Sequence, residues 1–411
     1  MKSNYKRLGD YISDVKIRNV DLKAQKLLGI NIDKFFMPSV ANIVGTDMSV
    51  YKIVKKNQFA CNRMHVGRDY RLPVSMSKTD EEFMVSPAYD VFQINDTKIL
   101  LQEYLMMWFT RSEFDRNAWF YTDADVRGGL HWKAFCDMEL PIPHPDKQKE
   151  IVKEYNVIQD RIALNKKLIQ KLEETAQAIY KEWFVDFEFP DINGKPYMSY
   201  NGIMVWSDKF EMELPTNWEI KKLKELTKEQ KPITYGVVKP GEEVENGVKF
   251  IRSGDLRGGE ILYSQLRTIS IEMSNQYKRT KLEGGEILIS IVGNPGQVAI
   301  VPFFLKGSNI ARQVAVLQVK NNDLQLFLKN HLISKKGQEK LKNITIGSVQ
   351  DVINLEDLRN LEVYVPSKDV LHKFNKIAQL FEQKLQHKFL ENQKMITLKN
   401  LLLSKVAQFK S

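Results

Sequence analysis

One long amphipathic segment constrains the fold of this chain more than any other feature. From about Asp146 to Phe184, apolar residues recur in alternating steps of four and three, the a/d pattern of a coiled-coil helix. The seam positions are Ile151, Tyr155, Ile158, Ile162, Asn165, Ile169, Leu172, Ala176, Ile179 and Trp183. At about 1.5 Å per residue, such a helix is about 60 Å long. One small domain cannot bury a seam of that length, so the pattern predicts a partner helix.

The C-terminal segment, roughly 367–409, supplies a partner of matching length. Shifted by 227 residues it repeats much of the seam, with Asn392 in the register of Asn165, whereas Lys399 breaks the match at the position of Leu172. The repeated seam positions are Leu385, Phe389, Asn392, Ile396, Leu403 and Val406. We therefore expect an antiparallel coiled coil in which the two asparagines are candidates for a layer that sets the register.

The regions before each helix also repeat. "YKRLGDYI" resembles "IKKLKELT", "YDVFQI" resembles "VAVLQV", and "MELPIP" resembles "LEVYVP". Both regions mix strand-like and helical stretches, so we expect an α+β fold with two mixed globules, two long helices and a pseudo-two-fold internal repeat. The predicted boundaries are 1–144 for the first globule, 145–184 for the central helix, 185–366 for the second globule with a connector at 185–217, and 367–411 for the C-terminal helix.

Composition narrows the class of partner. The 411 residues carry a formal net charge of +10, which favours a polyanion such as nucleic acid or an anionic membrane surface. No run of about 18 apolar residues occurs and the start, "MKSNYKRLGD", has no apolar leader core, so nucleic acid is the stronger expectation. Cys61 and Cys136 lie far apart and in no metal-binding pattern, which fits a reducing cytoplasm.

Catalytic signatures are missing from the sequence. It holds no dinucleotide or P-loop motif, no HExxH and no GxSxG, and its six histidines show no metal-ligand spacing. One weak nuclease-like pattern exists, Asp191 followed by Glu219 and Lys221, whose residue types could hold a metal ion and polarise a phosphate. A metal-dependent nuclease therefore stays open as an alternative, although such short patterns are common and Asp191 falls in a turn-like stretch.

Basic and amide residues cluster in loops of both globules. Arginine and lysine suit phosphates, and arginine, asparagine, glutamine and serine suit base edges. The candidates in the first globule are Asn62, Arg63, His65, Arg68, Tyr70, Arg71, Arg127, His131 and Lys133. Those in the second are Arg252, Ser253, Arg257, Asn309, Arg312, Gln313, Ser348 and Gln350. The segment 367–411 adds nine lysines against three acidic residues, which suits a phosphate backbone or an acidic protein, and equally an ordinary solvated helix face.

These stretches together resemble a known family. "NKKLIQKLEETAQAIYKEWFVDFEFPDINGKPY" is similar to the central conserved region of type I restriction-modification specificity subunits (HsdS), and "LPIPHPDKQKEIV" resembles the lead into it. "SPAYDVF" and "MHVGRD" resemble first-half recognition domains, while "VKFIRSGDL" and "GEILISIVGNPGQVAIV" resemble second-half ones. The C-terminal helix shares only part of the central helix's pattern.

The resemblance implies a non-catalytic, cytoplasmic DNA-binding subunit. Each globule would be a target-recognition domain for one half of a bipartite DNA sequence, and the helices would set the spacing and dock two methyltransferase subunits. Cofactors would belong to the partners: S-adenosylmethionine to the methyltransferase subunits, and ATP and Mg²⁺ to added restriction subunits. A protein-docking scaffold without direct DNA readout remains the other alternative.

Overall fold

The computed structural model describes residues 5–39, 45–64, 66–122, 128–347 and 350–407. The chain divides into two compact units. The first unit is Met1–Ala163 with Lys394–Ser411, and the second is Leu164–Gln393. The boundary falls inside both long helices, α5 (Pro145–Phe184) and α11 (Lys368–Val406). Each unit therefore contains one globule and part of each helix: α5 is divided about equally, whereas two thirds of α11 belong to the second unit.

The first globule is built on a four-stranded antiparallel sheet with the order β2-β9-β6-β7. The same globule contains two further antiparallel strand pairs, β3 with β4 and β5 with β8. Its strands are β1 (Tyr5–Arg7), β2 (Ile12–Asp14), β3 (Leu28–Ile30), β4 (Phe36–Pro38), β5 (Lys52–Val54), β6 (Phe59–Cys61), β7 (Val74–Met76), β8 (Phe83–Val85), β9 (Asp90–Ile94) and β10 (Glu139–Pro141). Its helices are α1 (Val66–Asp69), α2 (Gln102–Phe109), α3 (Ser112–Phe120) and α4 (Trp132–Asp137).

The second globule carries a four-stranded sheet, β14-β22-β19-β20, and a three-stranded sheet, β18-β15-β21. A connector hairpin, β11 (Met204–Ser207) with β12 (Met212–Pro215), precedes it. The remaining strands are β13 (Glu219–Lys222), β14 (Thr234–Tyr235), β15 (Val248–Ile251), β16 (Leu256–Arg257), β17 (Glu260–Ile261), β18 (Arg267–Ile269), β19 (Ile287–Ser290), β20 (Val298–Ile300), β21 (Asn309–Ile310), β22 (Val314–Leu317), β23 (Thr345–Ile346), β24 (Val352–Ile353) and β25 (Glu362–Val365). The helices are α6 (Leu223–Leu226), α7 (Ile271–Gln276), α8 (Asn322–Ile333), α9 (Lys335–Asn343) and α10 (Leu355–Asn360).

The two globules close on their long helices in the same way. The first strand of each globule pairs antiparallel with its last strand, directly before a long helix: Tyr5 faces Pro141, and Glu219 faces Val365. A buried amide at the start of each long helix then holds the first turn of a short helix. Gln148 bonds the backbone of Ile99 and Leu101 before α2, at 2.7 and 2.9 Å. Its counterpart 227 residues later, Asn375, donates to Asp323 in α8 at 3.0 Å.

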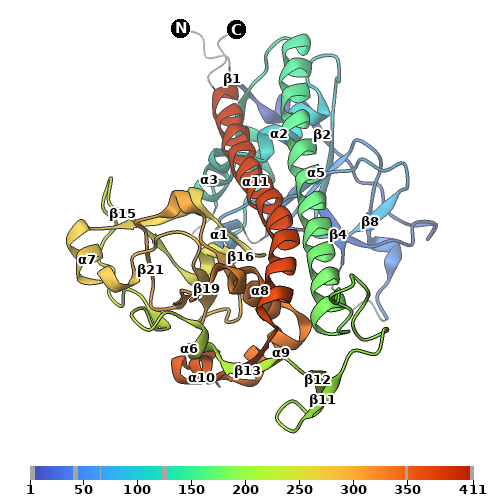
Figure 1. Ribbon diagram of the computed structural model, residues 1–411. Helices are drawn as coiled ribbons and strands as arrows, with labels where there is room; N and C mark the ends of the chain where they lie inside the picture. Colours follow the sequence, from blue (N-terminus) through green and yellow to red (C-terminus); the bar gives the residue numbers. More distant parts are fainter. Residues whose placement is uncertain (1–4, 40–44, 65, 123–127, 348–349, 408–411) are drawn as a thin grey trace. The chain divides into compact units, whose positions relative to one another are not determined.

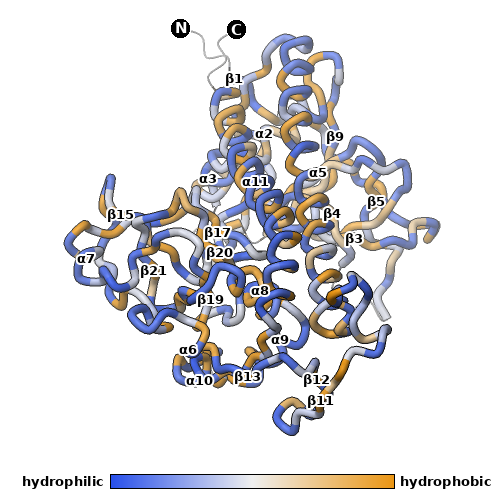
Figure 2. The backbone as a smooth tube through the Cα atoms, in the orientation of Figure 1, coloured by the Kyte–Doolittle hydropathy of each residue, from blue (hydrophilic) through white to orange (hydrophobic). Residues whose placement is uncertain are grey.

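The long helices meet in an antiparallel sense (α5 and α11 in Figure 1). In the first unit, Ile151 and Tyr155 of α5 share one apolar core with Leu403 and Val406 from the far end of α11. In the second unit, Trp183 and Phe184 from the other end of α5 pack against Phe374 near the start of α11, with ring centroids 5.8 and 4.8 Å apart. Hydrophobic and hydrophilic residues alternate along both helices (Figure 2). The mixed α+β class with two long paired helices is confirmed.

Most of the predicted seam is buried. Ile158, Ile162, Asn165, Ile169, Leu385, Asn392, Leu403 and Val406 are less than a tenth exposed, while Leu172, Ile179 and Phe389 are half-buried. Ile396 was wrongly placed in the seam, because it is 38% exposed. Near this level α11 buries Asn392 and Gln393 instead. Leu403 and Val406 lie farther along the same repeat and are buried, so the seam is interrupted at Ile396 and resumes after it.

Asn165 and Asn392 both lie in the second unit and are 0% and 7% exposed. Neither side-chain atom of Asn165 has a hydrogen-bond partner among the described residues, and the same holds for Oδ1 of Asn392. A buried amide costs stability relative to leucine, and coiled coils tolerate that cost where it fixes register. The register-setting role of this pair stays a prediction. None of the described helices is long and apolar enough to cross a bilayer.

A histidine ties α5 to the second globule. His331 of α8 is 1% exposed, and its Nδ1 lies 2.7 Å from the hydroxyl of Tyr180 on α5. Burial lowers the pKa of His331 to about 3, with smaller contributions from Lys340 and Lys336. The ring is therefore neutral in the folded chain, although it takes up a proton at ordinary pH once the chain unfolds.

This burial predicts an acid-sensitive second unit. The contribution of His331 is fully present above its unfolded pKa of about 6.5 and is lost as the pH falls toward 3. Between pH 7.5 and pH 5 the free energy of unfolding should fall by about 2 kcal/mol from this residue alone. Denaturant titrations should show that loss in the wild type and in His387→Gln, an exposed histidine of α11. A His331→Gln variant with an equally steep pH dependence would contradict the assignment.

Candidate nucleic-acid interface

Three of the arginines predicted in the first globule, Arg63, Arg68 and Arg71, lie in ion pairs at different depths. Arg63 pairs with Asp90 at 2.6 Å, also donates to the carbonyl of Leu130, and lies 5.6 Å from the ring of Trp132. Its side chain is only 20% exposed, so its first role is to hold the loop together. Arg68 pairs with Asp69, and Arg71 pairs with Asp33 at 2.9 Å. Both are more than half exposed and could exchange these carboxylates for phosphates.

Exposed aromatic rings lie beside these arginines. Tyr70 is 62% exposed, and its ring centroid is 5.3 Å from that of Trp119 at the end of α3. Phe120 and Tyr121 follow directly and are 77% and 52% exposed. Only Tyr70 was predicted. The run "WFY" at the end of a polar helix was the available signal, because large aromatic residues are rarely left in water without a partner. Flat exposed rings are the platforms on which nucleic-acid bases stack.

The remaining candidates of the first globule give less information. Asn62 is half-buried and its side-chain oxygen accepts from the amide of Met64 at 3.2 Å. His131 and Lys133 are exposed at the start of α4. His65 and Arg127 lie outside the described residues, as does Ser348 of the second globule.

Two predicted residues of the second globule, Asn309 and Arg252, make hydrogen bonds within the fold. Asn309 is completely buried, accepting from the hydroxyl of Ser274 at 2.6 Å and donating to the carbonyl of Tyr277 at 3.2 Å. Its selection as a base-contacting residue was wrong, because this asparagine ties β21 to α7 in the interior. Arg252 is tied to buried Asp255 by two side-chain bonds of 3.1 and 3.2 Å, which raise the pKa of its guanidinium. Ser253 follows in the half-buried turn.

A surface hollow of about 480 Å³ has one of the predicted residues, Arg312, in its lining. Four segments line it: the end of β14, the residues directly after β19, the connection from β21 to β22, and the β23–β24 pair with the start of α10. The lining residues are Tyr235, Val238, Ile291, Val292, Arg312, Ile346, Val352, Ile353, Asn354 and Leu355. Arg312 is exposed, and next to it Gln313 is half-buried, with its carbonyl accepting from the amide of Ile291 at 2.8 Å. Gln350 is exposed in the loop between β23 and β24.

The hollow depends on a close backbone approach. The amide of Arg312 donates to the carbonyl of Val237 at 2.9 Å, directly after β14. A Cβ at Gly236 would lie 1.8 Å from the carbonyl oxygen of Ile310, so only glycine allows these segments to meet. Tyr235 and Ile346 therefore flank the hollow while 45% and 60% exposed. A cation with apolar neighbours is the chemistry that reads a guanine edge or a thymine methyl.

Arg257 differs from the other predicted arginines of this globule. It lies on β16 and is exposed, with no ion pair to any residue in the described part of the chain. Its backbone pairs with that of Glu260 across a tight hairpin. Arg257 and Arg312 are therefore the two predicted cations of this globule that stay available at the surface.

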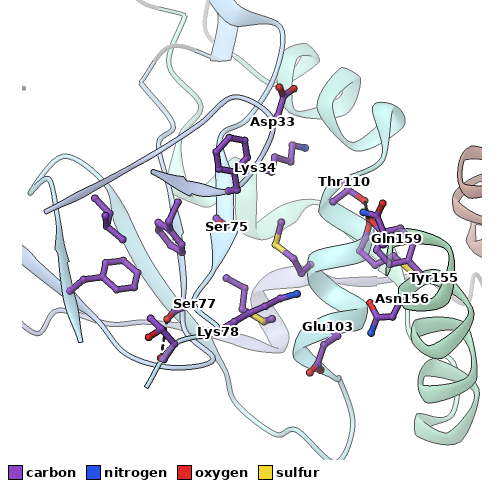
Figure 3. Close-up of a pocket in the computed structure, with 18 residues that line it drawn as sticks. Asp33, Lys34, Ser75, Ser77, Lys78, Glu103, Thr110, Tyr155, Asn156 and Gln159 are labelled. Carbon is purple, nitrogen blue, oxygen red and sulfur yellow. Dashed lines mark hydrogen bonds between the residues drawn. The ribbon is translucent and has the colours of Figure 1, made fainter. Parts of the chain in front are cut away.

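The first unit also contains a cavity of about 570 Å³ between its globule and α5. Tyr155, Asn156 and Gln159 of α5 lie on one side of it, and Lys34 and Asp33 lie near the other (Figure 3). Gln159 donates to the hydroxyl of Tyr155 at 2.9 Å. Lys34 is buried, pairs with Asp115 at 2.7 Å, and has its pKa lowered by that burial. Its ammonium is thus occupied by the fold and is not offered to a ligand.

The nuclease alternative is not favoured by the geometry. One carboxylate oxygen of Asp191 accepts from the amides of Asn193 and Lys195 at 2.7 and 2.8 Å, so it closes a turn. Glu219 pairs with Lys221 on the same exposed strand, β13. Within the described residues, no three acidic, histidine or cysteine side chains converge as metal ligands would.

Comparisons with known proteins agree with this architecture. Residues 215–400 match the family model described as "Type I restriction modification DNA specificity domain". The specificity subunit of the type I restriction enzyme EcoBI from Escherichia coli is 34% identical over 176 residues, which cover 42% of this chain and 37% of that protein. The MjaIX specificity subunit from Methanocaldococcus jannaschii is 25% identical, with 66% and 60% covered. The HindI specificity subunit from Haemophilus influenzae is 22% identical, with 91% of each chain covered.

The chain is similar to type I restriction-modification specificity subunits along most of its length, and residues 215–400 carry the match to their DNA specificity domain. A solved structure of an S subunit from M. genitalium has the same fold, with a TM-score of 0.55, 14% identity and coverage of 99% of this chain and 96% of that chain. The alignments span only about a third and three fifths of the E. coli and M. jannaschii relatives.

The hollow predicts a specific effect of Arg312. Replacing Arg312 with alanine should weaken binding of the target duplex by about 1–3 kcal/mol, because a good arginine contact to a base edge is worth that much. Arg279→Ala is the matched control, since this exposed arginine lies in the same globule and does not line the hollow. Binding measured by fluorescence anisotropy at one fixed salt concentration should separate the two variants. Equal losses would mean that the hollow has no special role.

Proposed function

We propose that this chain is the DNA-recognition subunit of a type I restriction-modification complex, acting in the cytoplasm without catalytic activity of its own. The observation that carries the proposal is the repeated plan: two globules, each closed in the same way onto a long helix and each built with parts of both helices. Such a repeat suits a target with two half-sites, one for each globule. The similarity to type I specificity subunits and the net charge of +10 support it.

We assign the recognition of the DNA base sequence to exposed side chains of the two globules. In the first globule we propose Arg68, Arg71 and the rings around Tyr70 as contacts, and in the second Arg257, Arg312 and Gln350. Cations without a buried role can take up phosphates, and the apolar hollow beside Arg312 suits base edges. The fully buried Asn309 drops out of this set.

The long helices are proposed to set the distance between half-sites. Recognition elements on one duplex commonly lie about one helical turn apart, about 34–36 Å, which equals about 23 residues of α-helix. Both α5, with 40 residues, and α11, with 39, exceed that length. Because both helices contribute to both units, a change in their length must change the separation of the readers.

Lengthening the helices should therefore lengthen the spacer. One heptad inserted after Ala163 in α5, with another before Lys394 in α11, preserves the seam and adds about 10 Å, or about three base pairs. The preferred spacer should grow accordingly while both half-site sequences stay the same. The test is methylation of a duplex library that varies only in spacer length.

The same seven residues inserted into the exposed loop at 241–246 provide the control, which should leave the spacer unchanged. An extended-helix variant that still selects the original spacer would refute the ruler.

The helix pair also offers a surface for methyltransferase subunits. In the first unit a groove of about 530 Å³ runs between α5 and α11, with Val157, Ile158, Leu398 and Leu402 among its lining residues. Val157 and Leu398 are 62% and 47% exposed, although apolar side chains on a helix normally face a core. We propose that helices of a methyltransferase subunit cover this groove. S-adenosylmethionine would be held by that subunit, and ATP and Mg²⁺ by restriction subunits.

Charge in the groove should weaken assembly. Val157→Glu and Leu398→Glu should each reduce the affinity for the methyltransferase subunit by tenfold or more, because a partner would have to bury an unpaired carboxylate. Ala163→Glu adds the same charge on an exposed face of α5 that does not line the groove, and should assemble normally. Sedimentation velocity with purified subunits gives the readout. Normal assembly of both groove variants would show that the methyltransferase subunit does not bind at this groove.

A further inference from the structure

One small hairpin of the second globule contacts both long helices. Strands β16 and β17 are joined by Gly258 and Gly259, whose φ angles of +57° and +76° form the tight primed type of turn. Leu256 and Ile261, at the ends of the hairpin, are 3% and 4% exposed and belong to the apolar core of the globule. The hairpin is therefore an extension of that core and must move with it.

One side chain of α11 holds the base of this hairpin. Gln393 is 5% exposed, and its Nε2 donates to the carbonyl of Ile261 at 3.1 Å. The amide of Ser264 donates back to Oε1 of Gln393 at 3.2 Å. One buried side-chain amide thus satisfies a backbone acceptor and a backbone donor three residues apart. Both bonds need one axial position of the helix, because a shift of one residue moves the side chain by about 1.5 Å and turns it by about 100°.

The tip of the hairpin lies against α5. A Cβ at Gly259 would be 3.1 Å from Oε1 of Glu173, and the positive φ there already disfavours any other residue. Between the two contacts lies Glu260, whose Oε2 is buried and has no hydrogen-bond partner among the described residues. Burial raises the pKa of Glu260 to about 7, partly offset by a bond to Gln393, and the neighbouring Glu173 raises it further. The hairpin is thus enclosed closely enough to exclude water from a carboxylate.

We propose that Gln393 is a positioning residue, which locks the second globule at one register on the helix pair and so makes the spacer between the half-sites sharp. The groups that meet at this joint are the hairpin backbone at Ile261 and Ser264, Gly259 at the tip, and Glu173 of α5. The exposed Arg257 sits on the same hairpin, so a proposed DNA contact is coupled directly to the helices. The spacer readout rests on the proposed function, whereas the joint itself does not.

The joint can be tested on the full chain alone. In the wild type the amide of Ser264 is protected by its bond to Gln393, so Gln393→Ala should speed its hydrogen exchange by at least tenfold. Gln383→Ala, the same change at an exposed position of α11, should leave the exchange rate as it is. An unchanged Ser264 rate in Gln393→Ala overturns the joint, whatever the function of the chain.

The positioning role is tested with the assembled methyltransferase complex. Duplexes carry both half-sites with spacers at the native length and one base pair shorter or longer. Wild type and Gln383→Ala should methylate the native spacer almost alone, whereas Gln393→Ala should lose at least tenfold of that selectivity and keep both half-site sequences. Gln393→Glu should behave like the alanine variant, because a carboxylate cannot donate to the carbonyl of Ile261.

The outcomes separate the possible failures. Unchanged spacer selectivity in Gln393→Ala, or loss of the second half-site sequence at every spacer, overturns the positioning role. If Gln393→Ala folds poorly, Gly259→Ala probes the same joint from the α5 side, and selectivity equal to wild type in that variant also counts against the proposal. A wild-type complex that methylates no bipartite duplex refutes the proposed function instead, while the exchange experiment still decides the joint.

Discussion

The structure depends on a seam that neither globule can bury alone. A helix of 40 residues with an apolar stripe along its length must cover that stripe, and each globule provides only part of the cover. In the first unit, the start of α5 shares a core with the end of α11, and in the second unit the order is reversed. Because every apolar seam residue left exposed costs free energy, the pairing of the helices and the folding of the globules support one another.

Buried polar side chains then fix one register of the long helices against the globules, where apolar packing alone would allow several. Gln148 and Asn375 fasten the first turns of the long helices to their own globules, and Gln393 fastens a hairpin farther along α11. Apolar contacts tolerate sliding, but a buried amide whose partners are lost pays the full cost of desolvation. In the proposed ruler, leucine and isoleucine of the seam would supply the stability, and these asparagine and glutamine side chains would fix the register.

The heptad pattern and the internal repeat predicted much of the fold. Both long helices, the antiparallel pairing and the strands "MELPIP" and "LEVYVP" that close each globule could be read from periodicity and self-similarity. Ile396 shows the limit, because it occupies a seam position of the repeat and is exposed, although Leu403 and Val406 farther along the same repeat are buried.

The candidate interface was harder to predict. Asn309 and Arg312 stand three residues apart, the first on β21 and the second in the connection to β22, yet the first lies in the interior and the second at the surface. Likewise Arg63 and Arg71 come from one basic stretch, but only Arg63 is drawn into the fold by Asp90 and Trp132. Partners supplied from distant segments decide which cation stays available, and no local pattern contains them. The rings of Trp119, Phe120 and Tyr121 become candidates for base stacking only because the structure leaves them exposed.

The central claim is that two globules on shared helices read one interrupted DNA sequence. Mapping of methylated adenines across the genome of the host, with the gene for this chain present and deleted, tests it most directly. The account predicts that one bipartite motif, with two defined halves and a gap of constant length, loses methylation when the gene is deleted. An unchanged methylation map, or loss of a motif without a gap, would contradict it.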